Sequence, residues 1–246
     1  MRAQPVSKLS VIYTDNHLLV VDKPAGIATM GTPQDTTTIA RQAALYLQQK
    51  YNKPGKAFVG VISRIDRLVS GVLVLARTSK AASRISEQLR QQSVEKFYLA
   101  IVEGRWPGAG RLDSADACSE LVDWVAKDER AQRMRVVDAS HPAAQQARLR
   151  AQPLAVSGDR TLLKIELLTG RKHQIRLQLA ERGTPIWGDQ KYGARSRFTK
   201  QNAIALHCQQ LTLKHPTTKQ SLTFRASPAG HWPAAPAEFS GWFEGV

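Results

Sequence analysis

Residues 61–77 decide how this chain folds, and their sequence is Val-Ile-Ser-Arg-Ile-Asp-Arg-Leu-Val-Ser-Gly-Val-Leu-Val-Leu-Ala-Arg. The segment 72–76 is short, apolar and partly β-branched, and it follows a glycine, which predicts a strand buried on both faces. Val61 and Ile62 predict the end of an earlier strand. The charged residues therefore fall in the connection between two strands.

Asp66 is the acid of this connection, and Arg64 and Arg67 stand close to it on either side. Two interpretations of these three residues are open. An acid at a strand end, flanked by arginines that hold it ionised, is suited to act as a nucleophile or a general base. The same residues are also typical of a surface turn with a solvated salt bridge, which contributes little to stability.

The composition predicts a stable globular protein with an anionic partner. The chain has 246 residues, of which 42% are hydrophobic, enough to build an ordinary core. Its 35 Lys and Arg residues against 20 Asp and Glu give a formal charge of +15, which favours nucleic acid as the partner. No apolar run reaches the roughly 18 residues that cross a bilayer, so a membrane partner is not expected.

The N-terminal segment and the cysteines indicate a cytoplasmic protein without a structural metal. Residues 1–7 lack an apolar secretory core. Cys118 and Cys208 belong to no Cys-x-x-Cys pair and to no Cys/His cluster with zinc spacing, so we expect reduced thiols. The six histidines are scattered and form no His-Glu-x-x-His motif, which argues against a zinc hydrolase.

The remaining segments predict paired strands with a few helices between them. The predicted strands are 11–14, 18–22, 96–102, 145–153, 161–168, 203–213 and 220–225, and the predicted helices are 36–49, 79–91 and a segment that follows Leu168 and runs to about Arg182. Residues 105–140 predict an inserted hairpin or a mobile surface excursion. Strands in pairs, without regular alternation with helices, indicate an α+β fold with a mixed or largely antiparallel sheet.

Three polar clusters lie within otherwise apolar segments. They are Arg64 with Asp66, Lys96 with Tyr98, and Arg171, Lys172 and His173 with Arg176. Motifs for ATP, dinucleotides and serine hydrolases are absent from the sequence. Tyr98 alone is more often a half-buried core residue than a catalytic one. The third cluster lies at a predicted helix start, which is suited to a phosphate or is simply a solvated helix end.

Several of these segments together resemble a known family. Residues 63–76 resemble the motif His-Arg-Leu-Asp-x-x-Thr-Ser-Gly-Leu-Leu of the RluA-type (RluA/TruC-like) RNA pseudouridine synthases. Other segments are similar to further motifs of that family, in the family's order: 15–26, 95–104, 168–176, 188–193 and 205–207 with His215-Pro216. The resemblance covers about residues 11–225.

The resemblance implies conversion of specific uridines to pseudouridine in structured ribosomal or transfer RNA, by base flipping and without a metal or an organic cofactor. Asp66 matches the family's catalytic aspartate, Tyr98 its active-site tyrosine, and Arg176 the arginine that pairs with the aspartate. Arg64 matches the arginine that helps to occupy the space of the flipped nucleotide. The implied pseudouridine synthase fold has a central basic RNA-binding cleft. The candidates for RNA binding are Arg64, Arg67, Lys96, Arg171, Lys172 and His173.

Three positions depart from the family's pattern, namely Ser63, where histidine is usual, Leu68 and Val69, where threonine is usual. We expect the changes at Ser63 and Val69 to loosen the hydrogen bonding that positions the Asp66 loop, and so to affect rate or substrate range. We also expect a single catalytic domain over residues 1–246, without the small N-terminal S4-type RNA-binding domain of some members. A monomer is the simplest expectation.

Two other functions are compatible with the charge of the chain. An RNA-binding protein or RNA chaperone would keep the same fold with impaired catalysis, although binding alone does not require Asp66, Tyr98 and Arg176 together. A general DNA-binding protein is less well supported, because the sequence contains no helix-turn-helix, zinc finger or basic zipper.

Overall fold

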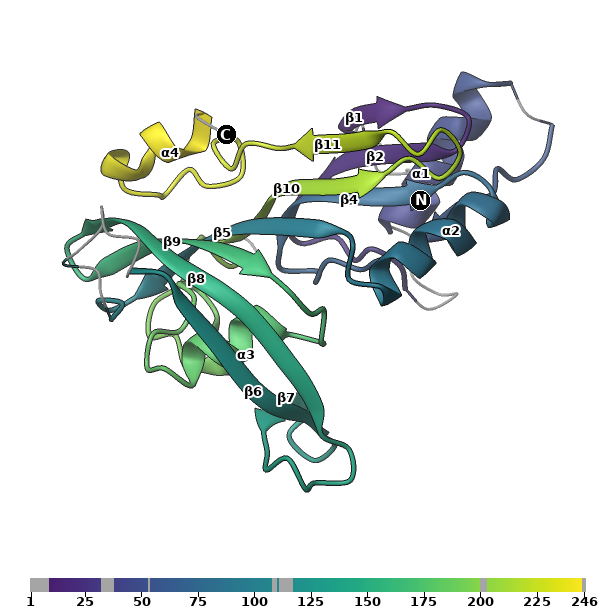
Figure 1. The fold of residues 1–246 in the computed structure, drawn as a ribbon. Helices are drawn as coiled ribbons and strands as arrows, with labels where there is room; N and C mark the ends of the chain where they lie inside the picture. The colour runs from purple at the N-terminus through teal and green to yellow at the C-terminus, as the bar shows by residue number, and fades with distance from the viewer. Residues whose placement is uncertain are drawn as a thin grey trace. The chain divides into compact units, whose positions relative to one another are not determined.

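The computed structural model describes residues 9–31, 38–52, 54–107, 110, 117–199 and 203–244, and the chain forms two compact units (Figure 1). The first unit comprises Met1–Val94 and Gln210–Ala226, and the second comprises Glu95–Gln209 and Ser227–Val246. Strand β10 (Leu206–Lys214) therefore begins in the second unit and ends in the first.

The first unit contains an antiparallel sheet. Its strands are β1 (Val11–Thr14), β2 (Leu18–Lys23), β3 (Gly60–Val61), β4 (Ser70–Ala76), β11 (Ser221–Arg225) and the end of β10. Strand β2 pairs with β1 and with β4, β3 also pairs with β4, and β11 pairs with β10. Every residue of β4 is buried, which confirms the predicted strand buried on both faces. The Asp66 loop thus leads directly into the hydrophobic core of this unit.

The helices of the first unit are α1 (Ile39–Lys50) and α2 (Ser79–Arg90). Each is capped by a threonine, Thr38 or Thr78, whose hydroxyl accepts a backbone N–H of the first turn at 3.2 and 3.1 Å. Helix α2 packs on β3 and β4 and buries Ala81 and Ile85. The predicted start of the first helix, at residues 36 and 37, lies outside the described residues.

The second unit contains an antiparallel set of strands. Its strands are β5 (Glu95–Glu103), β6 (Ser119–Asp128), β7 (Arg133–Val136), β8 (Gln145–Ser157) and β9 (Arg160–Leu167), with the start of β10. Their order across the sheet is β5-β9-β8-β6-β7. The segment 105–140 contributes the β6–β7 pair, which joins the sheet through β8; its positions 108–109 and 111–116 lie outside the described residues.

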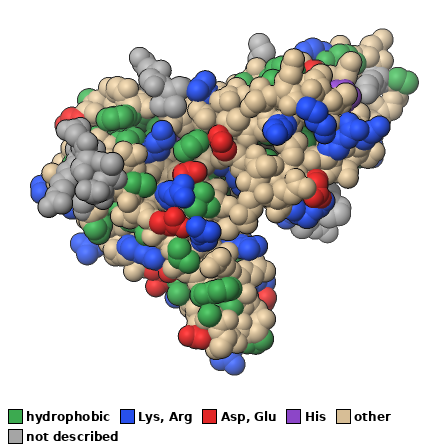
Figure 2. Space-filling model, in the orientation of Figure 1, with side chains coloured by type: hydrophobic (Ala, Val, Ile, Leu, Met, Phe, Trp, Pro, Cys, Tyr) green, Lys and Arg blue, Asp and Glu red, His purple; other side chains and the backbone are tan. Residues whose placement is uncertain are grey.

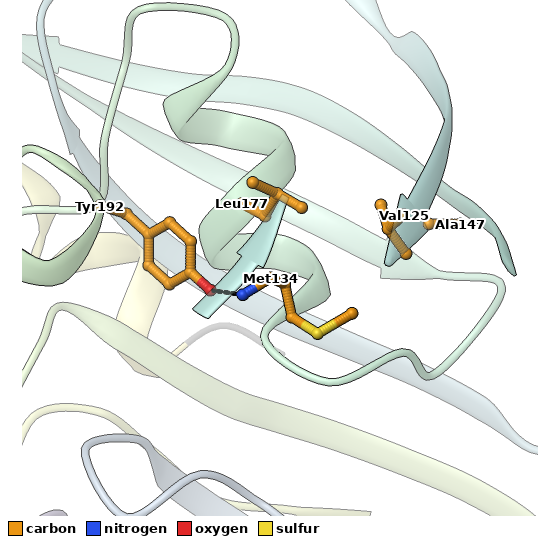
Figure 3. Close-up of a cluster of buried hydrophobic side chains, with 5 residues drawn as sticks. All are labelled: Val125, Met134, Ala147, Leu177 and Tyr192. Carbon is orange, nitrogen blue, oxygen red and sulfur yellow. Dashed lines mark hydrogen bonds between the residues drawn. The ribbon is translucent and has the colours of Figure 1, made fainter. Parts of the chain in front are cut away.

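One face of these strands packs on a short helix. The helical elements of the second unit are α3 (Gln174–Ala180), η2 (Gln190–Tyr192), η3 (Ala237–Phe239) and α4 (Gly241–Glu244). Figure 3 shows the buried cluster that joins α3 to the strands, formed by Val125, Met134, Ala147, Leu177 and Tyr192. Antiparallel strands with a few flanking helices confirm the predicted α+β class.

Helix α3 begins later than the sequence predicts. Its first residue is Gln174, so Gly170, Arg171 and Lys172 form an irregular turn before the helix and not its N-terminus. The side chain of Gln174 accepts the N–H of Arg171 at 3.0 Å. His173, directly before the helix, has a left-handed backbone with φ of 51°. The helix therefore starts about four residues after Gly170, and the N–H of Arg171 is already used within a local turn.

Candidate active site

The Asp66 loop lies between β3 and β4 in the first unit. One carboxylate oxygen of Asp66, Oδ1, accepts the backbone N–H of Leu68 at 3.0 Å, and the backbone carbonyl of Asp66 accepts the N–H of Val69 at 3.1 Å. Asp66 itself is half-buried, whereas Arg64 and Arg67 are exposed. The loop therefore presents a carboxylate from a tight turn, with two arginine side chains in solvent beside it.

A second loop, residues 23–29, holds the Asp66 loop on both sides. Gly26 donates its N–H to the carbonyl of Arg67 at 2.7 Å. The hydroxyl of the buried Thr29 donates to the carbonyl of Ile65 at 2.8 Å and accepts the N–H of the same residue at 3.3 Å. The backbone immediately before and after Asp66 is thus fixed by contacts 36 or more positions away in sequence, as between Thr29 and Ile65.

Lys23 is a buried cation close to this loop, with 0% of its surface exposed. Its ammonium donates to the carbonyls of Pro24 and Ile27 at 2.8 and 2.9 Å. Burial lowers the pKa of Lys23 to about 8, while the negative charges of Asp66 and then Asp22 act in the opposite direction. Lys23 and the Asp66 carboxylate therefore attract each other electrostatically.

We expect Lys23 to make the free energy of unfolding rise with pH between about 8 and 10. In this window the folded protein has released the proton of Lys23, whose pKa is about 8, whereas the unfolded chain still holds it, with an ordinary pKa of 10.5. Because the unfolded state then binds more protons, raising the pH favours folding, by up to about 3 kcal/mol over the full interval. Urea unfolding at several pH values measures this rise.

Two variants control the measurement. Lys23→Met should remove most of the rise, whereas replacing the exposed Lys80 of α2 by methionine should leave it unchanged. Burial also lowers the pKa of Lys96, which adds a contribution of the same sign in both variants. A stability difference between wild type and Lys23→Met that stays constant across the window would show that the lysine titrates as in water.

Lys96 and Tyr98 lie two positions apart on β5 in the second unit, so they share one face of that strand. Tyr98 is buried, and its burial raises the pKa of the phenol well above the ordinary value, with a further contribution from the hydrogen-bonded Cys208. Burial lowers the pKa of the Lys96 ammonium, which Cys208 partly counters. Tyr98 is therefore a neutral phenol at physiological pH, next to a half-buried amine and a buried thiol.

Arg176 lies in α3 and is almost fully buried, with 3% of its side chain exposed. Its Nε and Nη2 atoms donate to the two carboxylate oxygens of Asp189 at 2.6 and 2.7 Å, and only 1% of the Asp189 side chain is exposed. The guanidinium carbon also lies 5.0 Å from the centre of the Tyr192 ring. The second unit thus contains a buried two-point ion pair beside an aromatic ring.

The other basic candidates of the second unit lie near this pair at different depths. Arg171 and Lys172 are exposed, and Nε of Arg171 donates to the carbonyl of Gln146 at 2.9 Å. His173 is half-buried, and its Nδ1 lies 2.9 Å from the hydroxyl of Tyr192. Basic side chains also occur over much of the face visible in Figure 2, in keeping with the charge of +15.

The structure groups the predicted residues into two sets. Asp66, Arg64 and Arg67 lie in the first unit, and the second unit holds the remaining candidates, Lys96, Tyr98, Arg171, Lys172, His173 and Arg176. The sequence did not predict four partners of these residues, namely Lys23, Thr29, Cys208 and Asp189. Lys23 and Asp189 lie in segments that resemble family motifs, 15–26 and 188–193, and that position was the only signal in the sequence.

The described residues contain no group of three or more His, Cys, Asp or Glu side chains placed to hold a metal ion. Over the same part of the chain, no helix has the length and apolar character needed to cross a membrane.

Comparison with known proteins gives one family. The model of a family described as RNA pseudouridylate synthase matches residues 17–181. The ribosomal large subunit pseudouridine synthase C of Buchnera aphidicola (subspecies Schizaphis graminum) is 30% identical over 219 residues, which cover 87% of this chain and 65% of that protein. The tRNA pseudouridine synthase C of Yersinia pestis is 31% identical over 246 residues, with 95% of this chain and 91% of that protein covered.

A solved structure shares the fold. Human RNA pseudouridylate synthase domain containing 4 superposes with a TM-score of 0.68 at 22% sequence identity, covering 94% of this chain and 90% of that one. The chain spans 65% of the length of the Buchnera relative and 64% of the ribosomal large subunit pseudouridine synthase C of Vibrio vulnificus (strain CMCP6), which is 31% identical over 222 residues. The superposition on the human protein confirms the predicted pseudouridine synthase fold.

Proposed function

The chain belongs to the RNA pseudouridylate synthase family, and on that premise we propose that it isomerises specific uridines to pseudouridine in structured ribosomal or transfer RNA. The observation that carries the proposal is the Asp66 loop, where a carboxylate is held in a tight turn whose backbone is fixed on both sides. A solvated surface turn needs no such support from a buried threonine and a buried lysine.

The reaction moves the uracil from one bond to another without any net change in composition. The bond between N1 of the base and C1′ of the ribose breaks, the base turns, C5 bonds to C1′, and the C5 proton is released while N1 gains one. No electrons are exchanged with a cofactor. We assign Asp66 as the carboxylate that acts on the base or on the sugar, because an ionised oxygen can form and release such a bond.

Tyr98 and Arg176 are assigned supporting roles. A phenol whose pKa is raised by burial stays neutral, so Tyr98 can contact the base and take part in a proton transfer without carrying charge. Arg176 is assigned, on the motif that it matches, the role of the family's arginine that keeps the catalytic aspartate ionised. These roles follow from the family motifs that the two residues match.

The basic residues are proposed to bind and reshape the RNA. A uridine inside a stem must leave the stack, at a cost of a few kcal/mol, and phosphate contacts can offset that cost. Arg64 is exposed on the Asp66 loop and is proposed to take the space of the flipped nucleotide. Phosphate contacts are assigned to Arg67, Lys96, Arg171, Lys172 and His173.

The named relatives act on two kinds of RNA, and both remain in the proposal. The first is ribosomal large subunit RNA, by the name of the Buchnera and Vibrio proteins, and the second is transfer RNA, by the name of the Yersinia protein. The Yersinia relative matches this chain over nearly its whole length, so transfer RNA is supported as a substrate as well as ribosomal RNA. A monomer working in the cytoplasm completes the proposal.

Mapping of pseudouridines tests this function directly. Ribosomal and transfer RNA from cells without the protein should lack pseudouridine at one position or a few, and restoring the wild-type protein should return it. The purified protein should then modify the same positions in unmodified transcripts. Identical maps with and without the protein, combined with RNA binding by the purified chain, would instead support a binding protein or chaperone with this fold.

A further inference from the structure

We propose that Asp189 is a positioning residue that fixes the guanidinium of Arg176 for the reaction, an inference that rests on the proposed function. The two side chains make a two-point contact, Nε to Oδ2 at 2.6 Å and Nη2 to Oδ1 at 2.7 Å. Both are nearly free of solvent contact. A fork of this kind fixes the plane of an arginine as well as its location, which a single hydrogen bond does not.

Asp189 is itself held rigidly by its own segment. Its N–H donates to the carbonyl of Ile186 at 2.9 Å, and its carbonyl accepts the N–H groups of Tyr192 and Ala194 at 3.0 and 3.1 Å. The preceding Gly188 has φ of +89°, and a Cβ there would lie 2.6 Å from Cβ of Phe198, so no larger residue fits. The carboxylate therefore projects from a turn with little freedom to move.

The other side of the guanidinium rests against Tyr192. The ring centre lies 5.0 Å from the guanidinium carbon of Arg176. The hydroxyl of Tyr192 accepts the N–H of Met134 at 3.0 Å, as Figure 3 shows, and lies 2.9 Å from Nδ1 of His173. Strand β7 and the turn before α3 thus fix the ring, and the ring with Asp189 fixes the arginine.

The geometry of the fork divides the five guanidinium N–H bonds into two sets. Asp189 takes the Nε–H and one N–H of Nη2, which leaves one N–H of Nη2 and both N–H groups of Nη1 facing in other directions. Asp189 therefore contributes to the reaction by fixing the direction of these N–H groups.

A purely structural role explains this arrangement less well. Taking two charges out of water costs several kcal/mol each, and apolar residues of similar volume often serve stability equally well or better. Tyr192, against which Arg176 rests, belongs to an apolar cluster with Val125, Leu177 and Met134. A buried ion pair is expected where the reaction needs the arginine in one orientation. Misplacement of a reacting or positioning group by about 1 Å can lower the rate roughly 100-fold.

The test is a double-mutant cycle on a single-turnover reaction. RNA transcripts carrying tritium at C5 of uridine release it to water when pseudouridine forms, which reports the reaction without product separation. Asp189→Asn should lower this rate at least about tenfold while the Kd for the RNA changes less than about threefold. In an Arg176→Lys background the same change should lower the rate less than about twofold, because an ammonium has no fork to orient.

Three further measurements separate positioning from folding. Asp189→Glu, which keeps the charge but displaces it by one methylene, should give a rate between wild type and Asp189→Asn. Val125→Ala, which loosens the neighbouring cluster and keeps the ion pair, should leave the rate within about twofold at temperatures where it is folded. In the free protein, the slowly exchanging NMR signal of the Arg176 Nε–H should weaken or disappear in both Asp189 variants.

The inference is overturned if Asp189→Asn has the wild-type rate, or if the rate losses of Asp189→Asn and Arg176→Lys multiply in the double variant. It is also overturned if the NMR signal of the Arg176 Nε–H is unaffected. Should Asp189→Asn fail to fold, the Asp189→Glu rate and its NMR signal decide by the same criteria. If wild-type protein releases tritium from no ribosomal or transfer RNA, the proposed function fails, and positioning for that reaction fails with it.

Discussion

Asp66→Asn should abolish pseudouridine formation, with an expected loss of at least about 1000-fold in single-turnover rate. Asparagine keeps an oxygen that can accept the N–H of Leu68, so the turn of the loop should survive. The amide lacks the charged oxygen that would form and release a bond to the base or the sugar. The Kd for the RNA should change by no more than a few fold, because phosphate contacts dominate affinity.

Asp22→Asn is the matched control for this experiment. Asp22 is also an acid whose charge acts on the buried Lys23, more weakly than that of Asp66. Because this influence is the weaker of the two, removing the charge of Asp22 should leave the single-turnover rate within a few fold of wild type. The free energy of unfolding should also stay similar. Equal losses of rate in the two variants would show that the effect comes from the electrostatics of Lys23, and substantial conversion by Asp66→Asn would remove Asp66 from the chemistry.

Arg176→Ala should lower the free energy of unfolding by about 3–5 kcal/mol. The substitution leaves the Asp189 carboxylate, of which 1% is exposed, without the guanidinium that now satisfies both of its oxygens. The double variant Arg176→Met/Asp189→Leu should be about as stable as wild type, because it removes both charges and fills their space. Urea unfolding followed by tryptophan fluorescence gives the three values.

Arg182 offers a matched comparison on the same helical segment. It pairs with Asp123 at 2.7 Å, but the two side chains are 27% and 13% exposed, so water can replace the partner. Arg182→Ala should cost about 1 kcal/mol or less. If Arg176→Ala costs no more than Arg182→Ala, the buried pair has no special weight in the stability of the second unit.

The sequence predicts local elements of this protein well. A run such as Val72–Ala76 can only be a strand in an apolar interior, and every one of its residues is buried. Threonines before α1 and α2 act as caps, as their position indicates. Antiparallel pairing follows from short strands joined by turns, as in the Ser157–Arg160 turn between β8 and β9.

Contacts that are distant in sequence account for what could not be predicted. Nothing near Ile65 indicates that the hydroxyl of Thr29, 36 positions earlier, holds its carbonyl. Nor does the sequence around Arg176 reveal Asp189 as its buried partner, 13 positions later. The late start of α3 depends on Gln174, whose side chain bonds Arg171 and Thr169 and so favours a turn over a longer helix.

The Asp66 loop, which carries the departures at Ser63 and Val69, is shaped largely by backbone bonds. The bonds that shape the loop come from backbone N–H groups, those of Leu68 and Val69, and from the 23–29 loop. A backbone donor is kept whatever side chain the position carries. Val69 is also buried, where valine packs without needing a hydrogen-bond partner. These backbone bonds do not depend on the side chain at position 69, and an effect of the two departures on rate or substrate range stays a prediction.

Strand β10 has a consequence for how the protein is made. The first unit needs Gln210–Ala226 as well as Met1–Val94, so the ribosome must synthesise the whole of Glu95–Gln209 before the first unit can be completed. At elongation rates of about 5–20 residues per second this delay is on the order of ten seconds. During that time β2 and β4 can pair with each other, but the nascent chain still lacks β10 and β11. The N-terminal part of the chain is thus exposed to chaperones and proteases for longer than its position would suggest.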